Sequence, residues 1–431
     1  MRSFELVYEL KQQTPIIHFQ YAQKGAALRA TEVKPKLDRY IAKQYWKLTG
    51  ASIPKKWLIQ DGKGALAADA AERTRDKRLI PDEKGALNYR MVIKSEGEEH
   101  VELGRKTPYD IYYGNSGRDK PILGSKSKKL SLKLICTVRY KDNRTGKTLL
   151  EFMNEMIPSF FITHNFGSMQ RKGFGSYVIG SPDRDEIAKA LTEHYGASRC
   201  YAFDVDNDDI NGDFNTFARI KHIYSIIKSG VNLVDGTGDN HGRYRRSLLF
   251  LYMHERQNIS NEKAWLKQNN MAPTNVGLNA GAWHRPAANH PSHYVRAILG
   301  VGEKLEFRNS LDRENRSKTI VKIKSDVIGR LKSPIFFKVI GNVVYYIGEQ
   351  INPVIFGQDF VFTSRGTVKN LTVPAASHFD IADFLEYCYE QLNYSSDDIQ
   401  ANYPGSGYKA LRDFPLTRGV RIRRYEGGSW A

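Results

Sequence analysis

A glycine-rich, basic segment in the first half of the chain has the residue types of a phosphate-binding loop. Residues 164–179 have the sequence HNFGSMQRKGFGSYVI, in which Arg171 and Lys172 lie between closely spaced glycines. Glycine lacks a Cβ atom, so it fits where a backbone turns sharply or approaches a ligand closely. Successive N–H groups in such a loop form an anion-binding concavity that flanking cations reinforce. The segment therefore indicates a site for a phosphate chain or, alternatively, a tight basic turn on the surface.

The charge balance of the chain favours a polyanionic partner. Lys and Arg total 65 against 47 Asp and Glu, which gives a net charge of +18. An excess of this size favours nucleic acid first and an acidic membrane surface second. We expect no membrane span, because no run of 18 apolar residues is present. The three cysteines form no C-x-x-C pair and no signal-peptide pattern opens the chain, so we predict a cytoplasmic protein.

Two histidines are the candidates for acid–base chemistry on RNA. Metal-free cleavage of RNA needs a general base at the 2′-OH and an acid at the leaving 5′-oxygen. His18 follows the first predicted strand, and His164 begins the glycine-rich segment. A histidine that is buried or that contacts a partner is the commoner case. We therefore predict no catalytic residue, and keep His18 and His164 as the alternatives.

The remaining histidines give no metal motif. No H-E-x-x-H or related ligand spacing connects His241, His254, His284, His290 and His293. We expect neither a metal site nor a cofactor.

The first 60 residues predict a strand followed by a helix. Apolar and polar residues alternate over residues 4–11, as in a half-buried strand. Apolar residues recur at helical spacing over residues 37–48, and Pro35 suits the first turn of that helix. Lys36 and Arg39 fall on its polar side, where charges are usually solvated.

Residues 61–180 predict a hairpin, a strand, a helix and a short strand. We place the hairpin turn at residues 95–99, a mobile basic loop at 114–129 and a strand at 130–138. A helix over residues 146–157 ends at Pro158. The order resembles an embellished ferredoxin-like β-α-β-β-α-β unit, the architecture of RNA-binding domains of the RRM type.

We take the rest of the chain as a second domain, because 431 residues are too many for one ordinary core. The predicted domains are residues 1–181 and 182–431, and the predicted fold class is α+β with long insertions. The second domain has these expected elements: a helix at 213–228, a glycine-rich basic loop at 236–246, a strand at 248–253, a surface excursion at 258–292, a hairpin at 333–347 and a helix at 381–392.

Three features together resemble the RAMP superfamily of CRISPR effector complexes, and most closely the first subunit of the type III-B, or Cmr, complex. They are the first strand with Thr14-Pro15 after it, the basic segment 29–39 at the start of the helix, and the loop Gly167-x3-Arg171-Lys172-Gly173-x-Gly175. The strand at 333–337 is also similar to that family. The chain departs from the family pattern where a double Trp is usual, since Tyr45-Trp46 stands here.

The resemblance implies two ferredoxin-like domains and a glycine-rich loop that lies against RNA. It places Arg29, Lys34 and the loop residues at an RNA-facing groove. The full set of predicted RNA-binding residues is Arg29, Lys34, Lys36, Arg39, Gly167, Arg171, Lys172, Gly173, Gly175, Arg243 and Arg245. Aromatic residues near the loop, Phe166, Phe174 and Tyr177, are candidates for stacking on bases.

The prediction is a non-catalytic, RNA-binding subunit of a type III CRISPR ribonucleoprotein that works in antiviral defence. Its expected partners are CRISPR RNA, target RNA and other effector subunits, with no membrane contact. One alternative is a metal-independent endoribonuclease that processes CRISPR repeats through His18. Another is a scaffold subunit whose basic surface meets an acidic protein.

Overall fold

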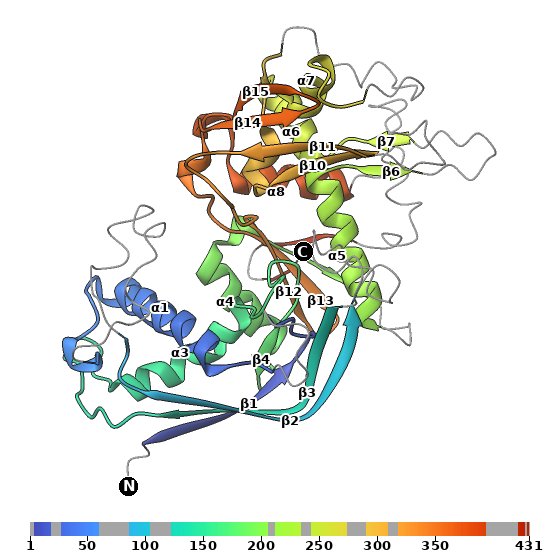
Figure 1. Ribbon diagram of the computed structural model, residues 1–431. Coiled ribbons are helices and arrows are strands. Elements are labelled where there is room, and N and C mark those ends of the chain that lie inside the picture. The colour runs from blue at the N-terminus through green and yellow to red at the C-terminus, as the bar shows by residue number, and fades with distance from the viewer. Residues whose placement is uncertain are drawn as a thin grey trace.

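The structure is a computed structural model that describes the chain in segments: residues 4–18, 27–59, 86–103, 122–205, 212–233, 243–273, 290–308, 318–393, 421–426 and 429–430. Helices and strands are interspersed through these segments (Figure 1). The named strand pairs of the described residues are antiparallel, with the short pair β8–β9 as the exception. The fold is therefore α+β, as predicted.

The first sheet belongs to the N-terminal part of the chain and has the strand order β2-β3-β1-β4. Its strands are β1 (Glu5–Gln12), β2 (Arg90–Leu103), β3 (Ile122–Ile135) and β4 (Tyr177–Ile179). Two helices, α1 (Ala30–Thr49) and α3 (Leu149–Thr163), lie together over one face of this sheet (Figure 1). Leu37 and Ile41 of α1 are fully buried with Phe152 and Phe160 of α3 in one apolar cluster. This core holds the start of α1 beside the glycine-rich loop.

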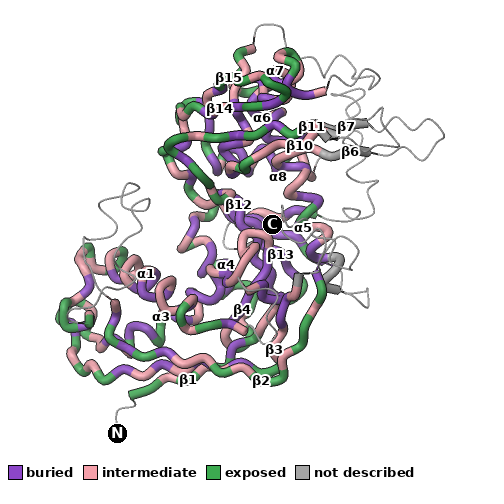
Figure 2. The backbone as a smooth tube through the Cα atoms, in the orientation of Figure 1, coloured by how far each residue is buried: buried purple, intermediate pink, exposed green. Residues whose placement is uncertain are grey.

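The second sheet connects the two halves of the chain and has the order β12-β13-β5-β16-β17. Its strands are β5 (Cys200–Asp204), β12 (Ile335–Ile340), β13 (Val343–Gly348), β16 (Arg423–Glu426) and β17 (Ser429–Trp430). Every residue of β12 and β13 is buried (Figure 2), because both faces of the sheet are covered. One face packs against α4 (Arg184–Tyr195), and the other packs against α5 (Gly212–Lys228) and α8 (Ile381–Asn393).

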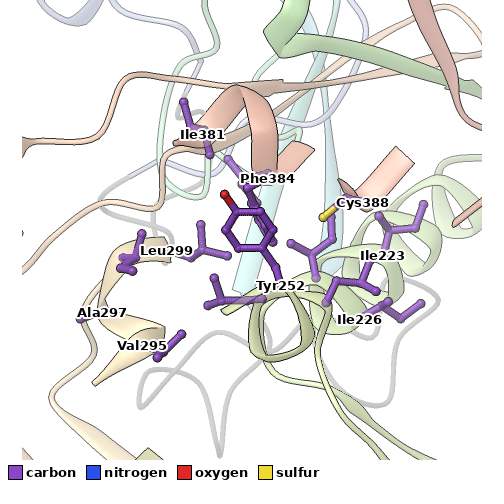
Figure 3. Close-up of a cluster of buried hydrophobic side chains, with 14 of the residues drawn as sticks. Ile223, Ile226, Tyr252, Val295, Ala297, Leu299, Ile381, Phe384 and Cys388 are labelled. Carbon is purple, nitrogen blue, oxygen red and sulfur yellow. The ribbon is translucent and has the colours of Figure 1, made fainter. Parts of the chain in front are cut away.

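The third sheet lies in the C-terminal half and has the order β10-β11-β14-β15. Its strands are β10 (Lys304–Arg308), β11 (Lys318–Lys324), β14 (Asp359–Ser364) and β15 (Thr367–Thr372). Tyr252 of α6 (Leu248–Gln257) is buried in a cluster with residues of α5, α8 and the short 3-10 helix η4 (Val295–Leu299), as Figure 3 shows. The remaining elements are α7 (Glu262–Gln268), β6 (Val231–Leu233), β7 (Arg243–Arg245), β8 (Ser260–Asn261), β9 (Ser292–His293) and the 3-10 helices η1 (Lys55–Trp57), η2 (Ala197–Arg199), η5 (Pro353–Ile355) and η6 (Ala376–His378).

Several predicted elements are confirmed. The strand at 4–11 is β1, the helix at 213–228 is α5, the hairpin at 333–347 is β12–β13, and the helix at 381–392 is α8. In the described part of the chain, no helix combines the length and the apolar composition that crossing a bilayer requires.

Four local predictions are wrong. Residues 95–99 do not turn but continue β2, because Gly97 adopts φ +66° opposite Lys128 and the pairing with β3 resumes after it. Residues 122–129 are part of β3, whereas 114–121 lie outside the described residues. The helix α3 passes through Pro158 and ends at Thr163. Residues 248–253 form a helix, because Ser247 caps it by accepting from the N–H of Phe250.

The predicted surface excursion at 258–292 is also wrong for its described residues. Ile259, Leu266 and Met271 are buried in the largest apolar cluster, so this segment packs into the core. Residues 274–289 lie outside the described part.

Candidate nucleic-acid interface

The glycine-rich loop, residues 165–176, connects α3 to β4 where the first and second sheets meet. Its backbone bonds to the segment after β1 and to β12. These bonds are Ser168 N to Ile17 O (2.7 Å), Gly175 N to Pro15 O (2.9 Å) and Phe337 N to Arg171 O (3.0 Å). The Asn165 side chain adds a bond to Phe337 O at 2.8 Å. These hydrogen bonds fix the conformation of the loop without any ligand.

Packing inside the protein explains the three glycines. Gly167, Gly173 and Gly175 have φ values of +81°, +87° and +64°, a region that disfavours side chains. A Cβ atom on Gly175 would lie 1.9 Å from Phe166 O, and one on Gly167 would lie 2.7 Å from Ile17 O. Glycine is therefore required here by the fold, and contact of these residues with RNA stays a prediction.

Lys36 is the cation of α1 that touches the loop directly. Its Nζ donates to Asn165 O at 3.0 Å and to Gln170 Oε1 at 2.8 Å. Burial lowers its pKa to about 8, Glu32 at 3.6 Å raises that pKa, and the charges of Lys332 and Arg39 lower it. Lys36, Arg39 and Lys332 thus form one basic group on the α1 side of the loop, with Glu32 as the carboxylate that acts on Lys36.

His18 and Arg29 lie at the same end of α1. Arg29 is the exposed N-cap residue of this helix. Partial burial and the charge of Arg29 lower the pKa of His18, and Glu32 raises it. Glu32 also accepts a hydrogen bond from the N–H of Gly167. The structure therefore brings together His18, Arg29, Lys36 and Gly167.

Lys34 lies apart from this group. Its Nζ forms an ion pair with Asp38 at 2.9 Å, donates to Leu87 O at 3.0 Å and lies 4.0 Å from the centre of the Tyr89 ring. These contacts join α1 to the segment just before β2, which gives Lys34 a structural role.

The two cations inside the loop have different surroundings. Arg171 forms an ion pair with Glu349 at 2.5 Å. Lys172 points toward α5, with its Nζ 5.7 Å from the centre of the Tyr224 ring. Burial lowers the pKa of Lys172, as do the charges of Lys228 and Lys221. Arg171 thus has a carboxylate partner, whereas the cations Lys228 and Lys221 act on Lys172.

The prediction that aromatic residues of the loop stack on bases is wrong. Phe166, Phe174 and Tyr177 are at most 1% exposed. Phe174 stacks on Phe217 of α5 with ring centres 4.0 Å apart. These rings belong to the core, and a base cannot reach them.

His164 is poorly placed for acid–base chemistry. Its Nδ1 lies 2.9 Å from Thr163 Oγ1 and 3.1 Å from Phe160 O, and its ring packs against Phe160 and Tyr40. Burial and the charge of Lys36 lower its pKa to about 3. An imidazole with so low a pKa is a weak base at neutral pH.

This environment predicts acid sensitivity. The folded pKa of His164 is about 3 and an unfolded histidine titrates near 6.5, so between these values the unfolded state binds the extra proton. Stability is therefore full above pH 6.5 and falls as the pH drops, by about 2 kcal/mol at pH 5 from this residue. In urea titrations at pH 7 and 5, His164→Gln should lose about 2 kcal/mol less than the wild type. Equal losses would contradict this, and His100→Gln on the exposed part of β2 is the control.

The remaining predicted residues, Arg243 and Arg245, form the ends of β7, which pairs with β6. Their side chains lie outside the described part of the structure.

Sequence reasoning missed three cations beside the loop: Lys221, Lys228 and Lys332. Lys332 precedes β12 by three residues, and the other two are on α5. Lys332 comes near Lys36 because β12 lies beside the loop, and Lys221 and Lys228 come near Lys172 because α5 does. No local pattern in the sequence indicates this proximity.

No three His, Cys, Asp or Glu side chains of the described residues converge as a metal site. His254 and His290 approach to 3.2 Å between their Nδ1 atoms, whereas His241 and His284 lie outside the described residues.

Comparison with known proteins identifies the family. Residues 3–231 match the model of the Cmr1 N-terminal domain, and residues 244–406 match that of the Cmr1 C-terminal domain. No curated protein matches the chain. One similar solved structure is described as "Cryo-EM structure of the Type III-B Cmr-beta bound to cognate target RNA". Its chain is 11% identical, with a TM-score of 0.33 over 90% of this chain and 100% of its own length. Because the two family models together span most of the sequence, the chain belongs to the Cmr1 family of CRISPR-associated RAMP proteins.

Proposed function

We propose that this protein is a non-catalytic subunit of a type III-B CRISPR effector complex that binds guide or target RNA through its phosphate backbone. Membership of the Cmr1 family supports the place in such a complex. Its partners would then be CRISPR RNA, target RNA and other effector subunits, acting in the cytoplasm in antiviral defence.

The observation that carries the RNA-binding role is the basic group on the α1 side of the loop. The charges of Arg39 and Lys332 both act on Lys36, and Glu32 is the acid among the charges that act on Lys36. Arg29 extends the group at the start of α1. Cations gathered in this way, in a chain of net charge +18, attract phosphates more than any neutral ligand.

Replacing Arg39 and Lys332 together by Gln should weaken binding of a single-stranded RNA about tenfold, because two phosphate contacts are lost. A filter-binding titration measures this. The matched control replaces Lys324 and Lys369, two exposed cations of the third sheet, and should change the affinity less than about twofold. Equal losses in both variants would mean that the basic group is not the site.

The non-catalytic role rests on the surroundings of the two candidate bases. His164 is half-buried and its pKa is lowered to about 3, which keeps it neutral at pH 7, and the charge that acts most on His18 is the Arg29 cation. Incubation of the protein with CRISPR repeat RNA tests this directly. Cleavage that His18→Ala abolishes would replace our proposal by the endoribonuclease.

We further propose that the first domain, residues 1–181, is a ferredoxin-like (RRM-like) unit and that residues 182–431 form a second one with insertions. The strand order β2-β3-β1-β4, with α1 and α3 on one face, supports the first assignment.

A further inference from the structure

The first sheet ends in a long strand, β2, whose outer edge pairs with no other strand of the described residues. This strand has 14 residues and pairs antiparallel with β3 from its first residue to its last. The strand order β2-β3-β1-β4 makes it the terminal strand, at the margin of the sheet in Figure 1. The N–H and C=O groups of every second residue in a terminal strand point away from the sheet, so this edge can accept a further strand.

The length and exposure of β2 differ from those of a protected edge. Natural edge strands are usually short or interrupted by Pro, and a typical strand has about 5–6 residues. β2 contains no Pro, and its middle residues 94–100 are exposed or half-buried (Figure 2). Met91 and Leu103, near its two ends, are buried and anchor it to two apolar clusters. The protein therefore holds this edge extended and accessible.

The charge of β2 is opposite to that of the whole chain. Residues 94–102 contain four Glu and one Lys, in a chain of net charge +18. Glu99 forms an ion pair with Lys128 of β3 at 3.0 Å. Glu98 and Glu102 lie opposite uncharged residues of β3, and because they are four positions apart in a strand, they project from the same face. β3 thus supplies no cation directly opposite either of these two carboxylates.

The sign of this charge selects the kind of partner. A second copy of the same edge would place Glu beside Glu, and like charges on adjacent strands destabilise the pairing. The phosphates of RNA would be repelled for the same reason. An extended segment that carries Lys or Arg at every second position would instead place cations beside Glu98 and Glu102, while its backbone pairs with the edge.

We infer that β2 is a docking edge, to which a basic, extended segment of a neighbouring protein subunit adds as a further strand of the first sheet. Main-chain hydrogen bonds would supply affinity, and Glu98 and Glu102 would select a basic sequence. That the segment comes from another subunit rests on the proposed place in an effector complex. The edge itself does not depend on RNA binding.

The test uses the full chain and a fluorescent synthetic peptide of alternating lysine and valine, at low salt. Fluorescence anisotropy should show binding, and Glu98→Lys together with Glu102→Lys should weaken it about tenfold. Hydrogen exchange followed by mass spectrometry should show that the peptide slows exchange of the amides of residues 94–102. Exchange in the rest of the first sheet shows whether the variant remains folded.

The matched control replaces Glu193 and Asp326 by Lys. Both are exposed acids outside the first sheet, so the net charge changes equally while β2 is untouched. This variant should change the affinity for the peptide less than about twofold.

Binding that depends on Glu98 and Glu102, together with slower exchange in β2, supports the inference. No binding, binding without slower exchange in β2, or an equal loss in both variants would refute it. Exchange in β2 that slows with protein concentration alone would identify a second copy as the partner, and exchange that slows on addition of single-stranded RNA would identify RNA. Either result overturns the basic segment. Failure of the RNA-binding proposal would instead appear in the Arg39 and Lys332 variant, in which β2 is unchanged.

Discussion

Replacement of Gly175 by alanine should destabilise the protein by about 3 to 5 kcal/mol, enough to unfold a marginally stable domain. The added Cβ atom would lie 1.9 Å from Phe166 O, a backbone atom that cannot rotate away. The two backbone segments cannot move apart freely, because Phe166 N donates to Gly175 O and Gly175 N donates to Pro15 O, both at 2.9 Å. The positive φ of +64° adds about 1 kcal/mol of backbone strain. Chemical denaturation monitored by circular dichroism measures the loss.

Gly180 provides the matched control for this prediction. It follows β4 with φ +65°, and a Cβ atom there would meet nothing within 4 Å. Gly180→Ala therefore isolates the backbone strain and should cost only about 1 kcal/mol. Similar losses in the two variants would show that the close approach of Phe166 to Gly175 does not exist in solution.

Replacement of Lys338 by methionine should destabilise the protein by about 3 kcal/mol, since three buried carbonyls would lose their donor. Lys338 is fully buried in β12. Its Nζ donates to Phe161 O at 2.7 Å, to His164 O at 2.9 Å and to Tyr177 O at 3.1 Å. Phe161 is in the last turn of α3, where carbonyls have no partner within the helix, so Lys338 acts as a cap delivered from another sheet.

The comparison variant for Lys338 is Lys369→Met, at an exposed position of β15, which should change stability by less than about 0.5 kcal/mol. Burial lowers the pKa of Lys338 well below its ordinary value, so part of the cost of its charge disappears in the methionine variant. A Lys338→Met protein as stable as the wild type would mean that this cost equals the gain from the three bonds.

Elements with strong local signals could be predicted from the sequence. The alternation in β1, the apolar spacing in α5 and the Gly341-Asn342 turn between β12 and β13 are local properties. The wrong predictions concern segments whose secondary structure depends on tertiary contacts. The apolar run 248–253 fits a strand or a helix equally, and the cap at Ser247 together with burial against α8 favours the helix. The sequence around Gly97 is typical of a hairpin turn, but the strand that contains Gly97 continues and pairs with β3, which is distant in sequence.

The candidate site was predictable in position and less so in composition. The residue types alone locate the glycine-rich loop. The contacts that require its glycines are not local in sequence, because Gly167 packs against Ile17, Gly173 against Ile220 and Gly175 against Phe166. Lys34 and Lys36 are the same residue type two positions apart, yet they project to different sides of α1. Lys332 and Lys338 reach the loop only because β12 lies beside it.

The most direct test of the account is the salt dependence of RNA binding by the purified chain. The equilibrium constant for a fluorescent single-stranded RNA should fall at least tenfold between about 50 and about 300 mM KCl, with log K linear in log salt. The slope should become shallower by about 1.4 when Arg39 and Lys332 are replaced, because each phosphate contact on a single strand contributes about 0.7. No binding at the lowest salt, or an unchanged slope in that variant, would contradict the proposal that this basic group holds RNA.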